Sequence, residues 1–134
     1  MPFVSYASVI ADDIVALSAF YSAVLGFPFV EDATDIYRGL DAGRGLVLAF
    51  SAPAVYDLLG MTSYRPVSGT RQYLTFELDS DDEVDERSEL ALLNGATVLH
   101  GAYETSYGAY QVVLADPEGN VFRLNHARPS VPST

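Results

Sequence analysis

The chain has 134 residues, of which 49% are hydrophobic and 12% aromatic, the composition of a folded protein of single-domain size rather than of a disordered chain. It contains no cysteine, which excludes disulfide bonds, a thiolate nucleophile and any sulfur-ligated metal site. The net charge of −11, from 18 acidic and 7 basic residues, disfavours nucleic acid and anionic membranes as partners.

The amino terminus lacks a basic segment followed by a long apolar core. No apolar run approaches the roughly 20 residues that span a bilayer. We therefore expect a soluble, cytoplasmic protein. Its acidic charge either serves solubility or favours cationic ligands.

The first half of the chain is predicted to form a strand, a helix and three short strands. Residues 3–10 are β-branched and aromatic, as in a strand. Asp13 can cap a helix over residues 13–25, and Gly26 can end it. The later strands are expected at residues 27–31, 35–40 and 46–50.

A connector rich in proline, glycine and serine, residues 52–71, separates the two halves. The pattern then restarts with a strand, a helix with an acidic start that ends at Asn94-Gly95, another strand, a loop and a hairpin. The hairpin turns at residues 116–120, where Pro117 presets φ and Gly119 tolerates a positive φ. The expected ranges are 72–78 and 97–100 for the strands, 101–108 for the loop, and 110–114 and 121–124 for the hairpin.

Each half thus has the order strand, helix, three strands, and short segments match between the halves at offsets of 67 and 69 residues. We predict an α+β fold of two tandem βαβββ modules that form a shared, curved mixed sheet around a cleft. The modules are placed at about residues 3–51 and 72–126 of a single domain, 1–134, with a tail at 127–134. A concave sheet of this kind suits a small-molecule ligand.

Two groups of residues carry a family resemblance. Asp13, Phe20-Tyr21 and Val24-Leu25-Gly26-Phe27 come early, and Asp116-Pro117-Glu118-Gly119-Asn120 comes late. Their order and spacing resemble the vicinal oxygen chelate superfamily, which includes glyoxalases, ring-cleaving dioxygenases, fosfomycin-resistance transferases and bleomycin-resistance proteins. The resemblance covers residues 3–126.

The resemblance implies four positions that hold a divalent metal in metal-using members, usually with His or Glu. In this chain those positions are Tyr6, Ala49, Tyr73 and Arg123. Alanine has no ligand atom, arginine is a permanent cation without a lone pair, and neutral tyrosine is a poor ligand. We therefore predict that the metal site is absent and that no cofactor is bound.

The same positions are expected to line the cleft. Tyr6 and Tyr73 are predicted to face each other as aromatic walls, or else to be core residues with paired hydroxyls. Arg123 requires an anion if it lies inside the cavity. Glu77 shares strand parity with Tyr73, so the partner is either Glu77 or a ligand carboxylate, phosphate or enolate.

An acidic, aromatic loop precedes the hairpin, with Tyr103, Glu104 and Tyr107. It is interpreted either as a surface loop that closes the core or as a lid over a flat or cationic ligand. The two histidines, His100 and His126, are expected at a strand end and in the tail, each as a surface or edge residue.

The leading hypothesis is a metal-free small-molecule-binding protein of the glyoxalase/bleomycin-resistance type, which sequesters an antibiotic or other natural product. The resemblance also implies a homodimer. The alternative is a lyase- or isomerase-type enzyme in which Arg123 holds an oxyanion and a Glu or Tyr transfers the proton. A third hypothesis retains a metal through Glu77, Glu104 and His100.

Overall fold

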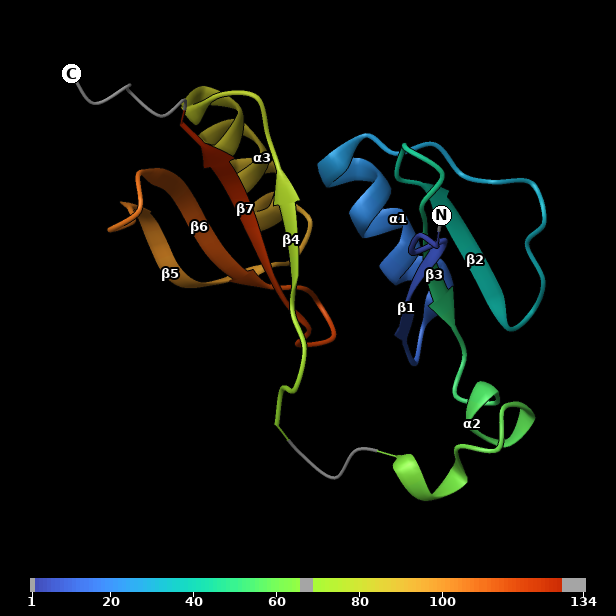
Figure 1. Cartoon of the computed structure of the whole chain (residues 1–134). Coiled ribbons are helices and arrows are strands. Elements are labelled where there is room, and N and C mark those ends of the chain that lie inside the picture. Colours follow the sequence, from blue (N-terminus) through green and yellow to red (C-terminus); the bar gives the residue numbers. More distant parts are fainter. Residues whose placement is uncertain (1, 66–68, 129–134) are drawn as a thin grey trace. The chain divides into compact units, whose positions relative to one another are not determined.

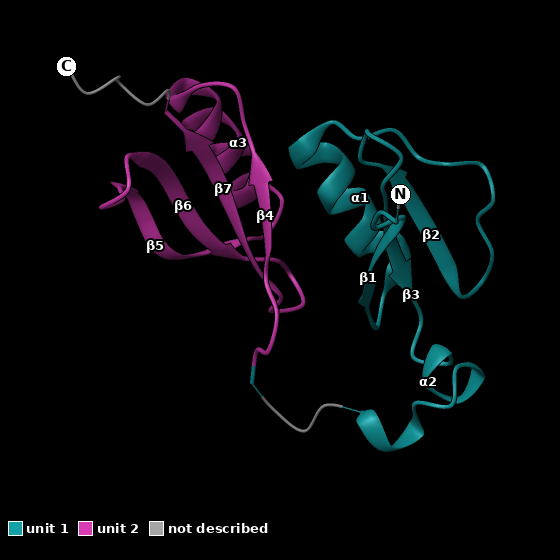
Figure 2. Ribbon diagram, viewed as in Figure 1, with its two compact units in different colours: residues 1–69 teal, residues 70–134 magenta. Residues whose placement is uncertain are grey.

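The computed structural model describes residues 2–65 and 69–128 and divides into two compact units, Met1–Gly69 and Thr70–Thr134 (Figure 2). Each unit contains one long helix and one mixed sheet (Figure 1). The α+β class and the tandem arrangement predicted from the sequence are confirmed. Residues 66–68 of the predicted connector and 129–134 of the predicted tail lie outside the described residues.

Unit 1 has a three-stranded sheet in the order β1-β3-β2, in which β3 is parallel to β1 and antiparallel to β2. The first and last strands of the module are therefore neighbours, with the helix between them in the chain. The elements are β1 (Tyr6–Ile10), α1 (Ile14–Leu25), β2 (Tyr37–Asp41), β3 (Val47–Ser51), the short helix α2 (Val55–Leu58) and a 3₁₀ turn, η1 (Thr62–Tyr64).

Unit 2 repeats this plan with one more strand. Its sheet has the order β4-β7-β6-β5, with β4 parallel to β7 and the other pairs antiparallel. The elements are β4 (Leu74–Glu77), α3 (Asp81–Leu93), β5 (Thr97–Glu104), β6 (Ala109–Ala115) and β7 (Val121–Ala127).

Local signals fix the ends of both long helices. Asp13 accepts a hydrogen bond from Ala16 N at 3.0 Å at the start of α1, and Gly26 ends that helix with φ of 76°. At the start of α3, Ser80 accepts from Glu83 N at 3.0 Å. The Glu83 carboxylate returns to the backbone N–H of Asp79, also at 3.0 Å, so side chains satisfy two free donors there.

Two of the predicted elements are wrong. Residues 27–31 form no strand and contribute only an isolated bridge between Phe29 and Leu40. The adjoining Pro28 has no N–H for a sheet ladder, and an acidic stretch follows. The predicted loop at 101–108 is strand as far as Glu104, because β5 continues through register shifts around His100.

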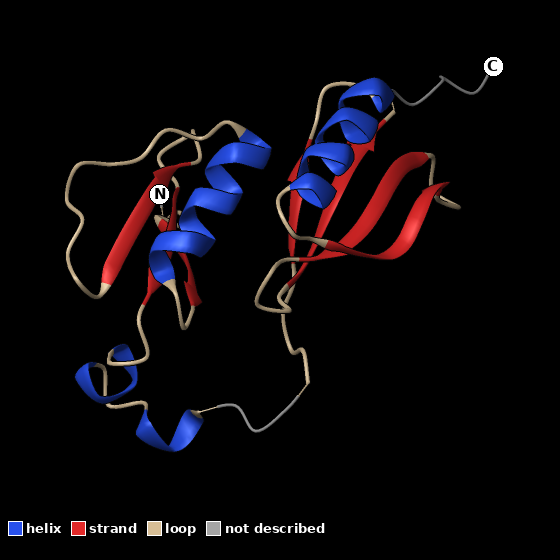
Figure 3. Cartoon of the chain, turned by 180° about the vertical axis from the view of Figure 1, so that it is seen from behind, coloured by secondary structure: helices blue, strands red, loops and turns tan. Residues whose placement is uncertain are grey.

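In each unit the long helix covers one face of its own sheet (Figure 3). Apolar side chains between the helix and the sheet are buried. In unit 1, Tyr21 of α1 stacks on Phe50 of β3 with ring centroids 5.5 Å apart. In unit 2, Val84 of α3 and the β7 residues Phe122 and Leu124 are fully buried. We call the other side of each sheet, away from that helix, its open face. Within the described part of the chain, no helix is long and apolar enough to cross a membrane.

Candidate functional site

Arg123 lies on the open face of the second sheet, in β7, where its register neighbours are Thr75 in β4 and Val113 in β6. The guanidinium is held from three sides. Nε donates to Thr75 Oγ1 at 2.9 Å, and Nη1 donates to Gln111 Oε1 at 3.2 Å. The Tyr73 ring packs against the same group, with its centroid 5.2 Å from Cζ. These contacts fix the guanidinium in position on the open face.

All of these partners are neutral. The sequence predicted either Glu77 or a ligand anion as the partner of Arg123. Glu77 does not contact Arg123, because its carboxylate accepts hydrogen bonds from other donors. Glu77 Oε1 accepts from Asn125 Nδ2 at 2.8 Å, and Oε2 accepts from Ala127 N at 2.6 Å. Within residues 2–65 and 69–128, no carboxylate forms an ion pair with Arg123, and Nη2 has no hydrogen-bond acceptor. Nη2 can therefore donate to a ligand oxygen.

Two further predicted tyrosines lie near Arg123, one in contact with it and one in contact with Gln111. Tyr107, in the turn between β5 and β6, places its hydroxyl 3.4 Å from both Arg123 Nη1 and Gln111 Oε1. Tyr103 accepts a hydrogen bond from Gln111 Nε2. Tyr103 belongs to β5 and not to a loop, so the predicted local structure is wrong. Its role in ligand binding stays a prediction.

Gln111 was missed by the sequence analysis, although it joins Arg123 to both tyrosines. It is only 3% exposed. The signal for it was present, because a glutamine interrupts the apolar run of β6. Its alternation with Val113 places both side chains on one face. A buried amide needs partners on both its oxygen and its nitrogen, and this site supplies them.

His100 also faces this site. It pairs with Val113 in register, which puts it on the open face, and its ring centroid lies 3.9 Å from that of Tyr103. His100 Nδ1 lies 2.8 Å from Gly101 O, an arrangement that favours the tautomer with the proton on Nδ1. The expected edge position is correct, since β5 is the edge strand, but His100 is not at a strand end because β5 continues to Glu104. The predicted tail position of His126 is wrong, because that residue lies in β7.

The other two predicted positions are in unit 1. Tyr6 is 53% exposed, whereas Ala49 is 1% exposed and pairs with Gly39 of β2. Tyr37 lies across Gly39, where a Cβ atom would meet the Tyr37 hydroxyl at 2.4 Å. Burial raises the pKa of Tyr37, and negative charge at Asp32 raises it further. The predicted contact of Tyr6 with Tyr73 would join the two units and stays a prediction.

The donor set does not suit a divalent metal. Arg123 puts a fixed positive charge at the β7 position, and Ala49 offers only a methyl group. Glu77, Glu104 and His100, the alternative metal ligands, do not come together. Glu104 pairs with Arg128, and Glu77 binds Asn125 and Ala127. No group of three or more His, Cys, Asp or Glu side chains in the described ranges could hold a metal ion.

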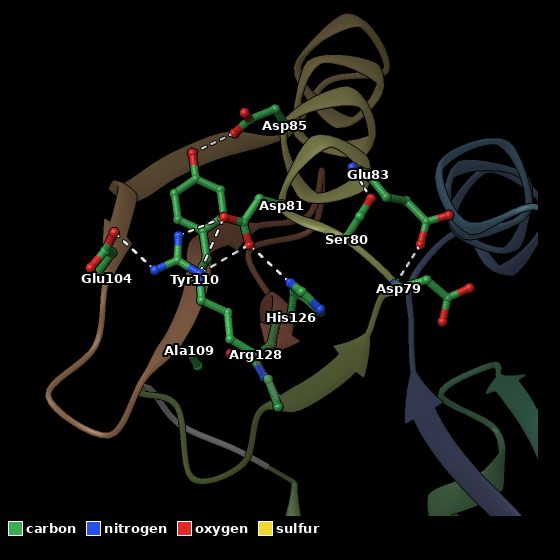
Figure 4. Close-up of polar contacts among 12 residues, drawn as sticks. Asp79, Ser80, Asp81, Glu83, Asp85, Glu104, Ala109, Tyr110, His126 and Arg128 are labelled. Atoms are coloured by element: carbon green, nitrogen blue, oxygen red, sulfur yellow. Dashed lines mark hydrogen bonds and ion pairs between the residues drawn. The ribbon is translucent and has the colours of Figure 1, made fainter. Parts of the chain in front are cut away.

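A second polar cluster lies between α3 and the ends of β5 and β7 (Figure 4). Arg128 bonds to Asp81 Oδ2 at 2.5 Å and to Glu104 Oε1 at 2.8 Å. His126 Nδ1 lies 2.9 Å from Asp81 Oδ1. Hydrogen bonds from Arg128 and then from His126 hold the pKa of Asp81 below its usual range. These groups satisfy one another and tie the start of α3 to the sheet.

Tyr110 extends this cluster along β6. Its hydroxyl donates to Asp85 Oδ1 at 2.6 Å, and the Arg128 guanidinium lies 5.6 Å from its ring centroid. The bond to Asp85, with burial, raises the pKa of Tyr110 to about 12. Tyr110 therefore stays protonated at neutral pH and serves the helix packing rather than the open face.

A family model for the glyoxalase-like domain matches residues 7–125. A solved structure from Burkholderia phytofirmans PsJN, a glyoxalase/bleomycin resistance protein/dioxygenase family enzyme, is 41% identical in sequence. The match covers 92% of this chain and 98% of that chain, with a TM-score of 0.89. None of the curated proteins matches the sequence.

More distant structures share the fold alone. A glyoxalase-related enzyme from Fulvimarina pelagi is 19% identical, with a TM-score of 0.80 over 94% of this chain and 88% of that chain. A lactoylglutathione lyase from Agrobacterium tumefaciens is 23% identical, with a TM-score of 0.70 over 92% of each chain.

Proposed function

Because this chain belongs to the glyoxalase-like domain family, within the predicted vicinal oxygen chelate superfamily, we propose that it binds a small molecule on the open face of the second sheet. In this proposal Arg123 takes the place of the family's metal ion and holds an oxyanion of the ligand. Thr75, Gln111 and Tyr73 keep the guanidinium in position, and no divalent ion or other cofactor takes part.

One observation carries this proposal: the guanidinium of Arg123 has only neutral partners in the part of the chain that the structure describes. A partly buried cation is stabilised by an anion, and residues 2–65 and 69–128 supply none. Hydrogen bonds between ionised groups are about twice as strong as neutral ones, so a carboxylate or enolate oxygen at Nη2 suits the site best.

The net charge of −11 acts against this local preference. A field of that sign repels anions at long range and attracts cations, as the hypothesis of a cationic natural product assumes. At physiological ionic strength such a field falls off over about 8 Å, so direct contacts at Arg123 outweigh the remote charges. The sign of the ligand's charge therefore separates the two forms of the binding hypothesis.

Benzoate and benzamidinium form a matched pair of opposite charge for this test. Calorimetric titration should show that benzoate binds and that benzamidinium does not. Arg123→Met should weaken benzoate binding by roughly tenfold or more, since it removes a charged hydrogen bond. Arg128→Met is the matched control and should leave the affinity unchanged, because that arginine serves the helix-covered face. Binding of benzamidinium alone would contradict the proposal and favour sequestration of cations.

The enzyme alternative has one observation in its favour. Glu77 shares the open face and is fixed by two donors, two register positions from the pair formed by Thr75 and Arg123. In that function Arg123 stabilises an enolate while Glu77 or Tyr103 moves the proton. Hydrogen–deuterium exchange at the methyl group of pyruvate, followed by NMR, tests it. Exchange that depends on protein and is lost in Glu77→Gln would establish enzymatic proton transfer.

The homodimer implied by the resemblance is retained as part of the proposal. Size-exclusion chromatography with light scattering measures the mass of the protein in solution. A mass equal to one chain would contradict the homodimer.

A further inference from the structure

The irregular part of β5 brings His100 and Tyr103 to the same side of the sheet. Residues three apart in a regular strand point to opposite faces. The register of β5 against β6 shifts between Val98 and His100 and again between His100 and Tyr103. Such β-bulges re-aim side chains and are frequent beside functional sites. Here they place the Tyr103 hydroxyl beside the Gln111 amide, which in turn contacts Arg123.

Arg123, Gln111 and Tyr103 are connected in that order by hydrogen bonds. The donor and acceptor in each bond follow from Arg123, which can only donate. The Gln111 atom that faces Arg123 must therefore be its oxygen, and the amide nitrogen must face the other way. That nitrogen donates to Tyr103, so the Tyr103 oxygen is an acceptor in this bond. The proton of the Tyr103 hydroxyl is consequently directed elsewhere.

The residues described by the structure offer no acceptor for that proton. Thr75 is in a similar state, because its hydroxyl accepts from Arg123 Nε and has no acceptor of its own in the same ranges. Because Arg123 can only donate, Thr75 accepts from it directly and Tyr103 accepts through Gln111, so the hydroxyl protons of Thr75 and Tyr103 are left for a ligand. The open face presents hydrogen-bond donors at Arg123 Nη2, Tyr103 and Thr75.

We propose that Tyr103 determines the specificity of this site by donating its hydroxyl proton to a second oxygen of the ligand. The ligand is then an anion that carries another acceptor, such as a carbonyl or a second carboxylate, close to its charged group. This inference rests on the proposed function, since it takes the binding of an oxyanion at Arg123 as given. Gln111 is the positioning residue, because it sets which way the Tyr103 proton points.

Benzoylformate and phenylacetate provide a matched pair of acids for the test. Both carry a phenyl ring and a carboxylate, but only benzoylformate has a keto oxygen beside the carboxylate. Calorimetry on the wild-type protein should show benzoylformate binding roughly three- to tenfold more tightly, the usual net effect of one hydrogen bond. Tyr103→Phe should abolish that preference without changing the affinity for phenylacetate.

Tyr110→Phe is the matched control, since it removes a hydroxyl from the opposite face of the same sheet. It should retain the full preference for benzoylformate. Gln111→Glu provides a second, independent variant. A carboxylate at that position accepts from both Arg123 and Tyr103, so both donors turn inward and both acids should lose affinity. Urea unfolding checks that each variant is folded.

The outcomes separate this inference from the proposed function. Equal affinities of the two acids for the wild type, or a preference that survives in Tyr103→Phe, would overturn the role of Tyr103. Binding through Arg123 would still stand in that case, provided that Arg123→Met weakens the binding of phenylacetate. If neither acid binds the wild-type protein, both proposals fail together.

Discussion

Arg123 and Arg128 lie five residues apart, one within β7 and one directly after it, and their surroundings differ in charge. Arg128 lies toward α3 and is held by two carboxylates, Asp81 and Glu104. Arg123 lies on the open face, where its partners in the described ranges are two hydroxyls, an amide and an aromatic ring.

This difference separates a structural cation from one available to a ligand. Arg128 joins α3 to the ends of β5 and β7, and its charge is matched by the protein. Arg123 is also held in position, but no carboxylate among the described residues matches its charge. A positioned cation without an anion is suited to binding one from outside. The comparison indicates a structural role for Arg128 and supports the proposal that Arg123 binds a ligand.

The largest effect is expected when the charge of Arg123 is reversed. Arg123→Glu removes a charged hydrogen bond and adds repulsion, so the affinity for benzoate should fall on the order of a hundredfold. The same variant should gain affinity for benzamidinium. Calorimetry measures both. Unchanged benzoate binding would show that the anion site lies elsewhere.

Charge reversal of the other arginine should have the opposite consequences. Arg128→Glu brings a third carboxylate next to Asp81 and Glu104, so the midpoint of thermal unfolding should fall while benzoate binding is retained. Differential scanning calorimetry and ligand titration on one preparation measure the two effects. A variant with wild-type stability would contradict the structural role of Arg128.

A smaller effect should appear in acid. The pKa of Asp81 is lowered from its usual 3.8, so the folded state favours the ionised carboxylate. Its contribution to stability is complete above about pH 4 and is lost as the pH falls through the lowered pKa. Asp81→Asn should therefore be less stable than the wild type at neutral pH, and the gap should close in strong acid. Urea unfolding across that range measures it, and a gap independent of pH would argue against the charge pairing.

The smallest effect is spectroscopic. The chain has nine tyrosines, and the pKa of Tyr110 is raised from 10.0 to about 12 by its bond to Asp85. A raised pKa stabilises the folded state below pH 10, and this contribution is lost as the pH rises through about 12. Ultraviolet titration of tyrosinate should show a late-titrating group that is missing in Tyr110→Phe. Its persistence in that variant would mean that another tyrosine is responsible.

Features of the fold that depend on neighbouring residues could be predicted from the sequence. The caps at Asp13 and Gly26 and the turn at residues 116–120 depend on neighbouring residues, and all three are present. The position of this turn allowed the start of β7, and therefore the strand that carries Arg123, to be predicted. The strand predicted at 27–31 failed because Pro28 and the acidic residues after it override the apolar signal.

The contacts that separate the two arginines could not be predicted, because they are not local. Asp81 and Arg128 are 47 residues apart, and Thr75 and Arg123 are 48 apart. The bulges in β5 also break the alternation by which faces are assigned, and they hid the approach of Tyr103 to Gln111.

The central claim is that Arg123, and not a divalent ion, holds the ligand's oxyanion. Calorimetric titration of benzoate into protein stripped with a chelator tests it most directly, with a parallel titration after divalent ions are returned. We expect the same affinity in both titrations and a loss of binding in Arg123→Met. Binding that appears only after the metal is returned, or a stoichiometric divalent ion in the untreated protein, would contradict the account.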